Sequence, residues 1–260
     1  MRLWRALWRL TALLCWTLMV SMLAMIACRN TPSGIRRATW YTRLWCRGII
    51  RTVGIRLTVH GRSSDFSGRL IISNHSSYLD IPLHGAFTRL RFAAKKEARH
   101  YPVLGPLLAS GLPIWVDREN RAESSRALEA YRQSLDIGVN LLVYPEGTTS
   151  DGLGAILPFK STAFQAVCGT SLPIQPIITR NHVAADGFNP AWYGDMTMCP
   201  HLIKMLFHRR LYCDLYILPV QYATPGETRK ELAERMHSYM SEALKVIEGG
   251  DSEAISQILA

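Results

Sequence analysis

The feature that most constrains the fold of this chain is a long uncharged stretch near its amino end. No charged residue occurs between Leu10 and Cys28, and this length approaches the ~20 apolar residues that a helix needs to cross a bilayer. Basic residues precede the stretch, and tryptophans suited to a membrane surface lie before and within it: Arg2, Arg5, Arg9, Trp4, Trp8 and Trp16. We therefore expect this segment to enter a membrane.

The residues after the apolar stretch bear on whether it is an anchor or a cleaved signal peptide. A basic start, an apolar run and the small Ala27 before Cys28 are typical of a signal-peptide processing site. Against cleavage, residues 36–56 continue with apolar side chains at near-helical spacing and arginines between them: Trp40, Leu44, Trp45, Ile49, Ile50 and Val53, with Arg36, Arg37, Arg43, Arg47 and Arg51. A basic amphipathic helix of this kind is typical of an anionic headgroup layer. We expect residues 1–56 to be membrane-anchoring helices.

The charge of the whole chain also indicates anionic partners. Among its 260 residues, Lys and Arg number 30 against 20 Asp and Glu, which gives a formal net charge of +10. Nucleic acid and an anionic membrane surface both fit this charge, but the amino-terminal segments favour the membrane, so we expect no nucleic-acid partner. Because basic residues are denser after the apolar stretch than before it, the rest of the chain should face the cytoplasm.

The six cysteines give no sign of a metal site. They are scattered along the chain, without the CxxC pairs or the histidine spacing of a zinc site. We interpret them as free thiols in a reducing compartment, and we expect neither a metal nor a cofactor.

Beyond residue 56 the pattern becomes short apolar runs that alternate with helical stretches, which predicts an α/β fold with a mostly parallel central sheet flanked by helices in residues 57–260. The candidate strands are Leu70–Ser73, Arg91–Ala94, Ile114–Val116, Asn140–Tyr144, Ile174–Thr179 and Leu211–Val220. Helices are predicted at Arg121–Ile137, with Asn120 and Glu123 as a capping box, from Lys160 to Val167, and after Pro225. Residues 181–210 are irregular and aromatic, and the pattern assigns them no element.

The sequence Asn-His-Ser-Ser-Tyr-Leu-Asp at residues 74–80 directly follows a predicted strand and precedes a helical stretch. In one continuous helix His75 and Asp80 would lie about 140° apart around the axis and could not meet. We therefore expect His75 in the turn and Asp80 in the first helical turn, folded back so that its carboxylate accepts the Nδ1–H of the imidazole. A histidine held in this way can act as a general base. Taken alone, the pair is more typical of a helix cap or a packed side chain than of a catalytic base.

Three further stretches carry polar residues at strand ends. Arg118 follows a strand and could bind an anionic oxygen, or could pair on the surface with Asp117. Glu146 could hydrogen-bond an acceptor hydroxyl, and Gly147 permits close backbone approach, although both would also suit a simple turn. Lys160 is a candidate for contact with an anion or is merely solvated.

Together, in this order and spacing, these pieces resemble the glycerolipid acyltransferase family, the lysophospholipid acyltransferases with an NHxxxxD motif. The family's blocks are NHxxxxD, a GxxxxxxR-like stretch, a PEGT-type loop and a VPI-type strand. They match residues 74–80, 111–118, 145–148 and 172–177, and the resemblance covers roughly residues 57–220. It implies that His75 is the catalytic base and Asp80 its partner. The matching substrate-binding positions are Arg118, Glu146, Gly147, Thr148 and Lys160.

The resemblance implies a direct transfer from acyl-CoA or acyl carrier protein to the free hydroxyl of a lysolipid, with 1-acyl-sn-glycerol-3-phosphate as the leading acceptor and phosphatidic acid as the product. One position departs from the family. The PEGT block commonly continues with an arginine that contacts phosphate, whereas Thr149 stands there in this chain. Because threonine offers no charge, an acceptor without phosphate, such as lyso-ornithine lipid, stays open.

Two other classes of protein compete with this interpretation. A lipid or thioester hydrolase would use water as the acceptor, but the chain has no GxSxG elbow to supply a serine nucleophile. A non-catalytic lipid-binding protein could keep the same fold. Retention of His75, Asp80, Arg118 and Glu146 together speaks for an enzyme.

Overall fold

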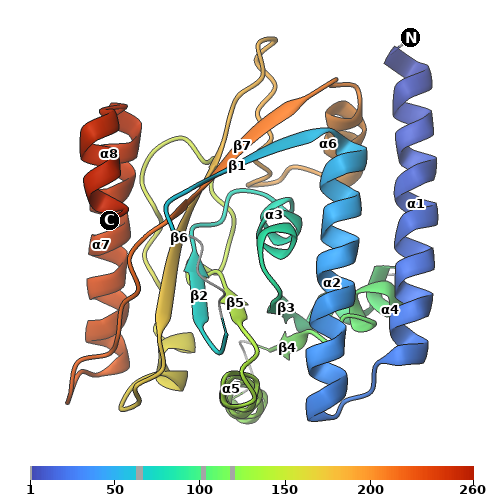
Figure 1. Cartoon of the computed structure of the whole chain (residues 1–260). Coiled ribbons are helices and arrows are strands. Elements are labelled where there is room, and N and C mark those ends of the chain that lie inside the picture. Colours follow the sequence, from blue (N-terminus) through green and yellow to red (C-terminus); the bar gives the residue numbers. More distant parts are fainter. Residues whose placement is uncertain (1, 63–66, 101–103, 118–120) are drawn as a thin grey trace.

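A computed structural model describes residues 2–62, 67–100, 104–117 and 121–260, and Figure 1 shows it. Its strands are β1 (Ile55–His60), β2 (Leu70–Ser73), β3 (Arg91–Lys95), β4 (Ile114–Val116), β5 (Leu141–Val143), β6 (Ile174–Asn181) and β7 (Leu211–Ile217). Its α-helices are α1 (Arg2–Ala27), α2 (Pro32–Val53), α3 (Asp80–Phe87), α4 (Leu104–Ala109), α5 (Arg121–Asp136), α6 (Met198–Leu206), α7 (Arg229–Gly249) and α8 (Ser252–Ile258). Two short 3₁₀ helices are η1 (Lys96–His100) and η2 (Ala163–Ala166).

The described strands form one sheet in the order β1-β7-β6-β2-β5-β3-β4. Neighbouring strands are parallel except for β6 and β7, which pair in antiparallel fashion. The prediction of an α/β fold with a mostly parallel sheet is therefore confirmed. Helices cover both faces of the sheet, which explains why its central strands read as continuous apolar runs rather than as an alternation of apolar and polar residues.

The two faces of the sheet bury separate cores because successive side chains of a strand point to opposite sides. In β2, Leu70 and Ile72 pack with residues of α5 and α7, whereas Ile71 packs on the other face with residues of β3 and α3. The apolar faces of the two long helices supply much of the first core, with Leu128 of α5 partly buried at its edge. Their buried residues include Ala127, Tyr131 and Leu135 in α5, and Leu232, Met236, Met240, Ala243 and Ile247 in α7.

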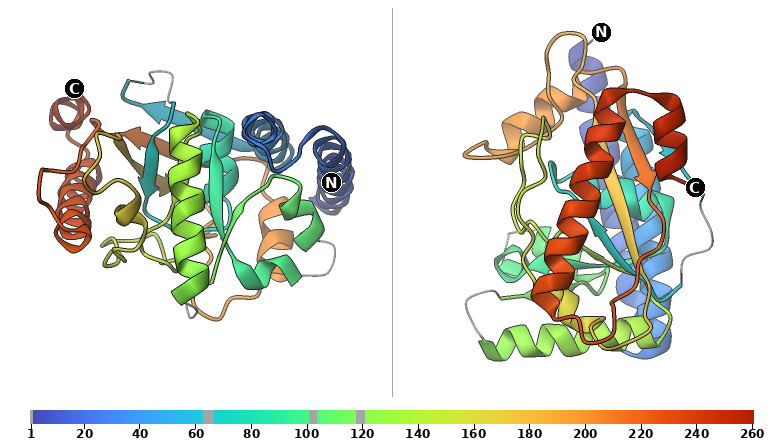
Figure 2. Two further views of the ribbon diagram at one scale, coloured as in Figure 1. Left: turned by 90° about the horizontal axis from the view of Figure 1, so that it is seen from below. Right: turned by 90° about the vertical axis from the view of Figure 1, so that its left-hand side faces the viewer.

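The amino-terminal helices α1 and α2 pack against each other and form a layer outside α3 (Figures 1 and 2). The indole of Trp16 donates to the carbonyl of Trp45, and the indole of Trp45 donates to Thr17. The pair packs closely, because a Cβ at Gly48 would lie 1.9 Å from the Trp16 indole nitrogen. At the amino end of α1, the guanidinium groups of Arg5 and Arg9 donate to main-chain carbonyls between α6 and β7. By length and composition, Leu3–Ala27 could cross a membrane.

Where the structure differs from the sequence prediction, the reasons are local. The amphipathic helix ends at Val53 rather than Arg56, because Gly54 adopts a left-handed conformation (φ 86°) and caps it. The chain then enters β1, a strand that the sequence did not predict. The expected strand to Val220 stops at Ile217, before Pro219, which has no N–H for a ladder.

Two other segments also differ from prediction. The helix expected from Lys160 to Val167 is only the 3₁₀ turn η2, with Phe164 fully buried and Gly169 left-handed soon after it. The unassigned region 181–210 contains α6 and a loop that packs over residues 76–78. The predicted capping box rests on Asn120, which lies outside the described residues. The division of the chain at residue 56 stays a prediction.

Candidate active site

The turn between β2 and α3 folds around the carboxylate of Asp80, the first residue of α3. Asp80 Oδ2 accepts hydrogen bonds from the main-chain N–H groups of Ser76 (2.8 Å) and Ser77 (2.9 Å), and its side chain is fully buried. Short polar side chains often organise turns in this way. The main chain of the turn is therefore built on the same carboxylate that faces His75.

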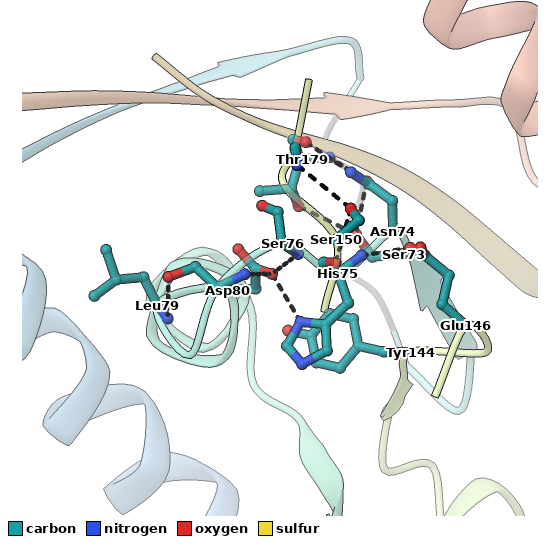
Figure 3. Close-up of polar contacts among 12 residues, drawn as sticks. Ser73, Asn74, His75, Ser76, Leu79, Asp80, Tyr144, Glu146, Ser150 and Thr179 are labelled. Carbon is teal, nitrogen blue, oxygen red and sulfur yellow. Dashed lines mark hydrogen bonds and ion pairs between the residues drawn. The ribbon is translucent and has the colours of Figure 1, made fainter. Parts of the chain in front are cut away.

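The imidazole of His75 lies against that carboxylate, with Nδ1 2.8 Å from Asp80 Oδ2 (Figure 3). An ionised carboxylate only accepts hydrogen bonds, so the pairing places the proton on Nδ1 and leaves the lone pair on Nε2. In Figure 3, Nε2 points away from Asp80 and carries no dashed contact. The His75 side chain is 18% exposed, which leaves it accessible while its partner is buried. The predicted geometry, with His75 in the turn and Asp80 folded back, is what the structure shows.

Tyr144 at the end of β5 holds the plane of the imidazole. Its ring stacks on His75 with centroids 4.0 Å apart and an angle of 10° between the planes. The Tyr144 hydroxyl lies 3.3 Å from Nδ1 of His84, whose ring is fully buried and which also bonds the main-chain oxygen of Asp80 at 2.7 Å. Burial lowers the pKa of His84, so this second histidine is neutral and serves as a support. Neither side chain was predicted to belong to the site.

Glu146 holds the turn from the other side, rather than facing an open cavity. One carboxylate oxygen accepts the N–H of His75 at 2.6 Å, and the other accepts the N–H of Leu157 at 3.0 Å. The residue is only 3% exposed. Burial raises the pKa of Glu146 to about 7, against the effect of the two N–H donors. Both carboxylate oxygens thus have main-chain partners. A contact between Glu146 and an acceptor hydroxyl stays a prediction.

The remaining predicted substrate-binding residues are more open. Gly147 has a positive φ of 76°, which requires glycine at this turn. Thr148 and Lys160 are exposed, and the main-chain N–H of Lys160 bonds Pro145, which keeps it beside the same loop. Arg118 lies outside the described residues. Among the described residues, no group of three or more His, Cys, Asp or Glu side chains could hold a metal ion.

The region that the sequence pattern left unassigned forms one wall of the site. The main-chain N–H of Trp192 donates to the carbonyl of Ser76 at 2.7 Å, and the Ser77 hydroxyl donates to Pro190. From α6, His201 pairs with the Tyr78 hydroxyl at 2.9 Å. Apart from the aromatic character of residues 181–210, no sequence signal marks these contacts, because they are long-range in the chain.

Comparisons with known proteins agree with this geometry. A family model described as Acyltransferase matches residues 56–180. The lyso-ornithine lipid O-acyltransferase of Rhodobacter capsulatus is 34% identical over 74% of this chain and 71% of that protein. The 1-acyl-sn-glycerol-3-phosphate acyltransferase of Neisseria meningitidis is 26% identical over 80% of both.

A solved structure shares the fold. The crystal structure of the 1-acyl-sn-glycerophosphate (LPA) acyltransferase PlsC from Thermotoga maritima is similar with a TM-score of 0.68 and 18% identity, over 95% of this chain and 98% of that one. At this identity the likeness concerns the fold alone. The sequence matches carry the classification: this chain belongs to the acyltransferase family and is an acyltransferase enzyme.

Proposed function

We propose that this enzyme transfers an acyl chain from a thioester to the free hydroxyl of a lysolipid, with His75 as the general base. The observation that carries the proposal is the 2.8 Å contact between His75 Nδ1 and buried Asp80, which leaves Nε2 free to take a proton. As the acceptor oxygen attacks the thioester carbonyl, its proton passes to Nε2. The C–S bond then breaks, and the imidazolium returns the proton to the departing thiolate.

The other residues of the site support this step in different ways. Glu146 and Tyr144 hold the main chain and the ring of His75. Thr148 of the PEGT loop and Lys160 beside it are exposed, where an acceptor headgroup would arrive. With Arg118, these exposed residues form the proposed headgroup contacts, and Gly147 lets the loop turn beneath them.

For the acceptor, we favour lyso-ornithine lipid and keep 1-acyl-sn-glycerol-3-phosphate as the second candidate. Three relatives matched over at least 74% of this chain are named lyso-ornithine lipid O-acyltransferases, from R. capsulatus, Brucella abortus and Rhizobium meliloti, with 34%, 30% and 28% identity. Thr149 stands where a phosphate-binding arginine is common in the family, and it removes a charge that a phosphate needs more than an amino acid headgroup does. The N. meningitidis relative supports the second candidate.

We further propose that α1 and α2 keep the catalytic domain on the cytoplasmic face of the inner membrane. The contacts between Trp16 and Trp45, and those of Arg5 and Arg9 with the segment before β7, support an α1 that is retained in the mature protein. Acyl-CoA and acyl carrier protein are both anionic and would be drawn to the basic protein surface.

The test offers labelled acyl-CoA or acyl carrier protein to the purified enzyme with lyso-ornithine lipid, with 1-acyl-sn-glycerol-3-phosphate, with both, or with neither. Products are identified by mass spectrometry. We expect acylated lysolipid, mainly from lyso-ornithine lipid, and little thioester consumption without an acceptor. Equal release of free fatty acid with and without lysolipid would instead identify a hydrolase. If neither lysolipid is acylated, the proposal is refuted.

A further inference from the structure

Asp80 has a second neighbour that belongs to none of the sequence blocks. Asn181, the last residue of β6 and 7% exposed, points its side-chain amide into the catalytic turn. Its Nδ2 donates to the hydroxyl of Ser76 at 2.9 Å and lies 3.4 Å from Asp80 Oδ1. The same amide therefore reaches both the carboxylate and the residue whose N–H binds that carboxylate.

A hydrogen-bond donor on one side of the Asn181 amide and an acceptor on the other fix which end of the amide faces Asp80. Asn181 Oδ1 accepts from the thiol of Cys213 at 2.9 Å, across the β6–β7 pair, where the two residues are direct register partners. Cys213 is fully buried, and burial raises the pKa of its thiol, so the sulfur carries a proton to donate. Asp80 can only accept, so the nitrogen of the amide must face it.

The charged and titratable groups around Asp80 come from several elements. They are His75 on the turn, His84 on α3, Tyr144 and Glu146 after β5, and Cys213 on β7. His84 is neutral and Cys213 is protonated, because burial disfavours their charged forms. From β6, the partially positive Nδ2 group of Asn181 lies next to Asp80 Oδ1 and attracts its negative charge.

We infer that Asn181 is a positioning residue for the His75–Asp80 pair, set in place by Cys213. The inference rests on the proposed roles of His75 and Asp80. The Asn181 amide steadies Ser76 at the head of the turn, and its attraction for Oδ1 keeps Oδ2 turned towards His75. At 3.4 Å the second contact is longer than an ordinary hydrogen bond, so the charge on the amide and the short bond to Ser76 act together.

The test compares Asn181→Ala with Asn140→Ala. Asn140 is also a buried asparagine, 3% exposed, whose amide bonds main-chain groups of residues 69 and 89, and it precedes β5 at the opposite end of that strand from Tyr144. Each variant is purified, its unfolding midpoint is measured, and kcat and KM are followed against pH with acyl-CoA and the acceptor that the wild-type enzyme uses.

We expect Asn181→Ala to lower kcat about tenfold with little change in either KM, since the loss concerns the reaction step and not substrate binding. Without the amide, the carboxylate becomes a stronger proton acceptor for Nδ1–H, so the acid limb of kcat/KM should move to higher pH by about half a unit or more. Asn140→Ala should lower the unfolding midpoint and leave the pH profile in place. An Asn181→Ala enzyme with the wild-type kcat and pH profile would overturn the inference.

Two further variants keep the test decisive if Asn181→Ala does not fold. Cys213→Ser retains a donor for the Asn181 oxygen and should keep the wild-type pH profile, whereas Cys213→Ala should move it in the direction of Asn181→Ala. Unchanged profiles in both would contradict the inference. His75→Ala, run in parallel, separates the two proposals: if it stays active, the assigned base is wrong, and if it is inactive while Asn181→Ala behaves as wild type, only the role of Asn181 fails.

Discussion

The turn that carries His75 and the loop that carries Thr148 lie side by side, yet they are held very differently. In the turn, the N–H groups of residues 75, 76 and 77 all bond buried carboxylates, and the ring of His75 is stacked on Tyr144. In the loop, the side chain of Thr148 is exposed, as is that of the nearby Lys160. The proposed general base is thus held by contacts of its main chain and of its ring, whereas the exposed side chains of the loop are not needed to hold it.

This contrast separates two properties of the enzyme. A change in the turn should affect kcat for every acceptor, because it disturbs the proposed base itself. A change on the loop should alter the choice between acceptors and leave the reaction step in place.

The largest effect should come from His75→Ala. We expect kcat to fall about 10³- to 10⁴-fold with either acceptor, because the general base is removed. The unfolding midpoint should stay close to that of the wild type, because the bonds of the turn to Asp80 and Glu146 use main-chain atoms. His182→Ala, a histidine whose side chain is 40% exposed, is the control and should remain active. Residual activity above a tenth of wild type would contradict the assignment.

Asp80→Asn should have the next largest effect, about 10²- to 10³-fold on kcat. Asparagine carries no negative charge to stabilise the imidazolium, and an amide nitrogen in place of Oδ1 would face the Nδ2 donor of Asn181, 3.4 Å away. The double variant with His75→Ala should be little worse than His75→Ala alone, because the two side chains act as a unit. Steady-state rates for the two single variants and the double variant check this, and additive losses would mean that Asp80 acts elsewhere.

Glu146→Gln should lower kcat about tenfold at neutral pH, because a glutamine offers one acceptor oxygen to the two main-chain N–H groups that the carboxylate holds. The pKa of Glu146 in the folded chain is about 7, against an ordinary value of 4.5. Between these values the unfolded chain releases this proton while the folded chain keeps it. The free energy of unfolding of the wild type should therefore fall, relative to Glu146→Gln, as pH rises from 4.5 to 7.

Activity should change with pH in the opposite sense. Only the ionised Glu146 accepts from both His75 and Leu157 without presenting a proton to either, so the wild-type advantage in kcat should grow as pH rises towards and above 7. Denaturant titrations and rates for both proteins between pH 5 and 8 measure the two trends. A constant ratio of rates over this range would show that ionisation of Glu146 does not matter to the turn.

The smallest effect should come from the loop. Thr149→Arg should leave kcat for lyso-ornithine lipid within about threefold and raise relative activity on 1-acyl-sn-glycerol-3-phosphate about three- to tenfold, since a guanidinium binds phosphate through a planar fork of donors. Leu153→Arg adds the same charge nearby, at a residue that is 61% exposed, and should change neither. Equal shifts in both variants would mean that any added positive charge near the loop has this effect, and not an arginine at position 149 in particular.

Much of the fold and the central pair of the site follow from local patterns. The strand Leu70–Ser73 is a continuous apolar run and the long helices α5 and α7 have strong apolar periodicity, and the structure places them where these patterns predict. The pairing of His75 with Asp80 also follows from five residues of chain, because a helix forbids the contact and a turn permits it.

The remainder depends on contacts between distant parts of the chain. Strand β1 was not predicted. Its first residues, Ile55 and Arg56, were assigned to the preceding helix, and the left-handed conformation of Gly54 ends that helix before them. Glu146 binds the main chain of a residue 71 positions away, and a main-chain partner leaves no mark in the sequence. Asn181 and Cys213 become neighbours only through the register of β6 and β7.

The most direct test of the account follows one turnover by intact-protein mass spectrometry, with acyl donor and enzyme mixed first without an acceptor. If His75 acts as a base in a direct transfer, the protein mass should stay unchanged, the thiol should appear only when the lysolipid is added, and His75→Ala should release almost none. An enzyme that gains the mass of one acyl chain before the acceptor arrives would contradict the account and would point to a nucleophile on the chain itself.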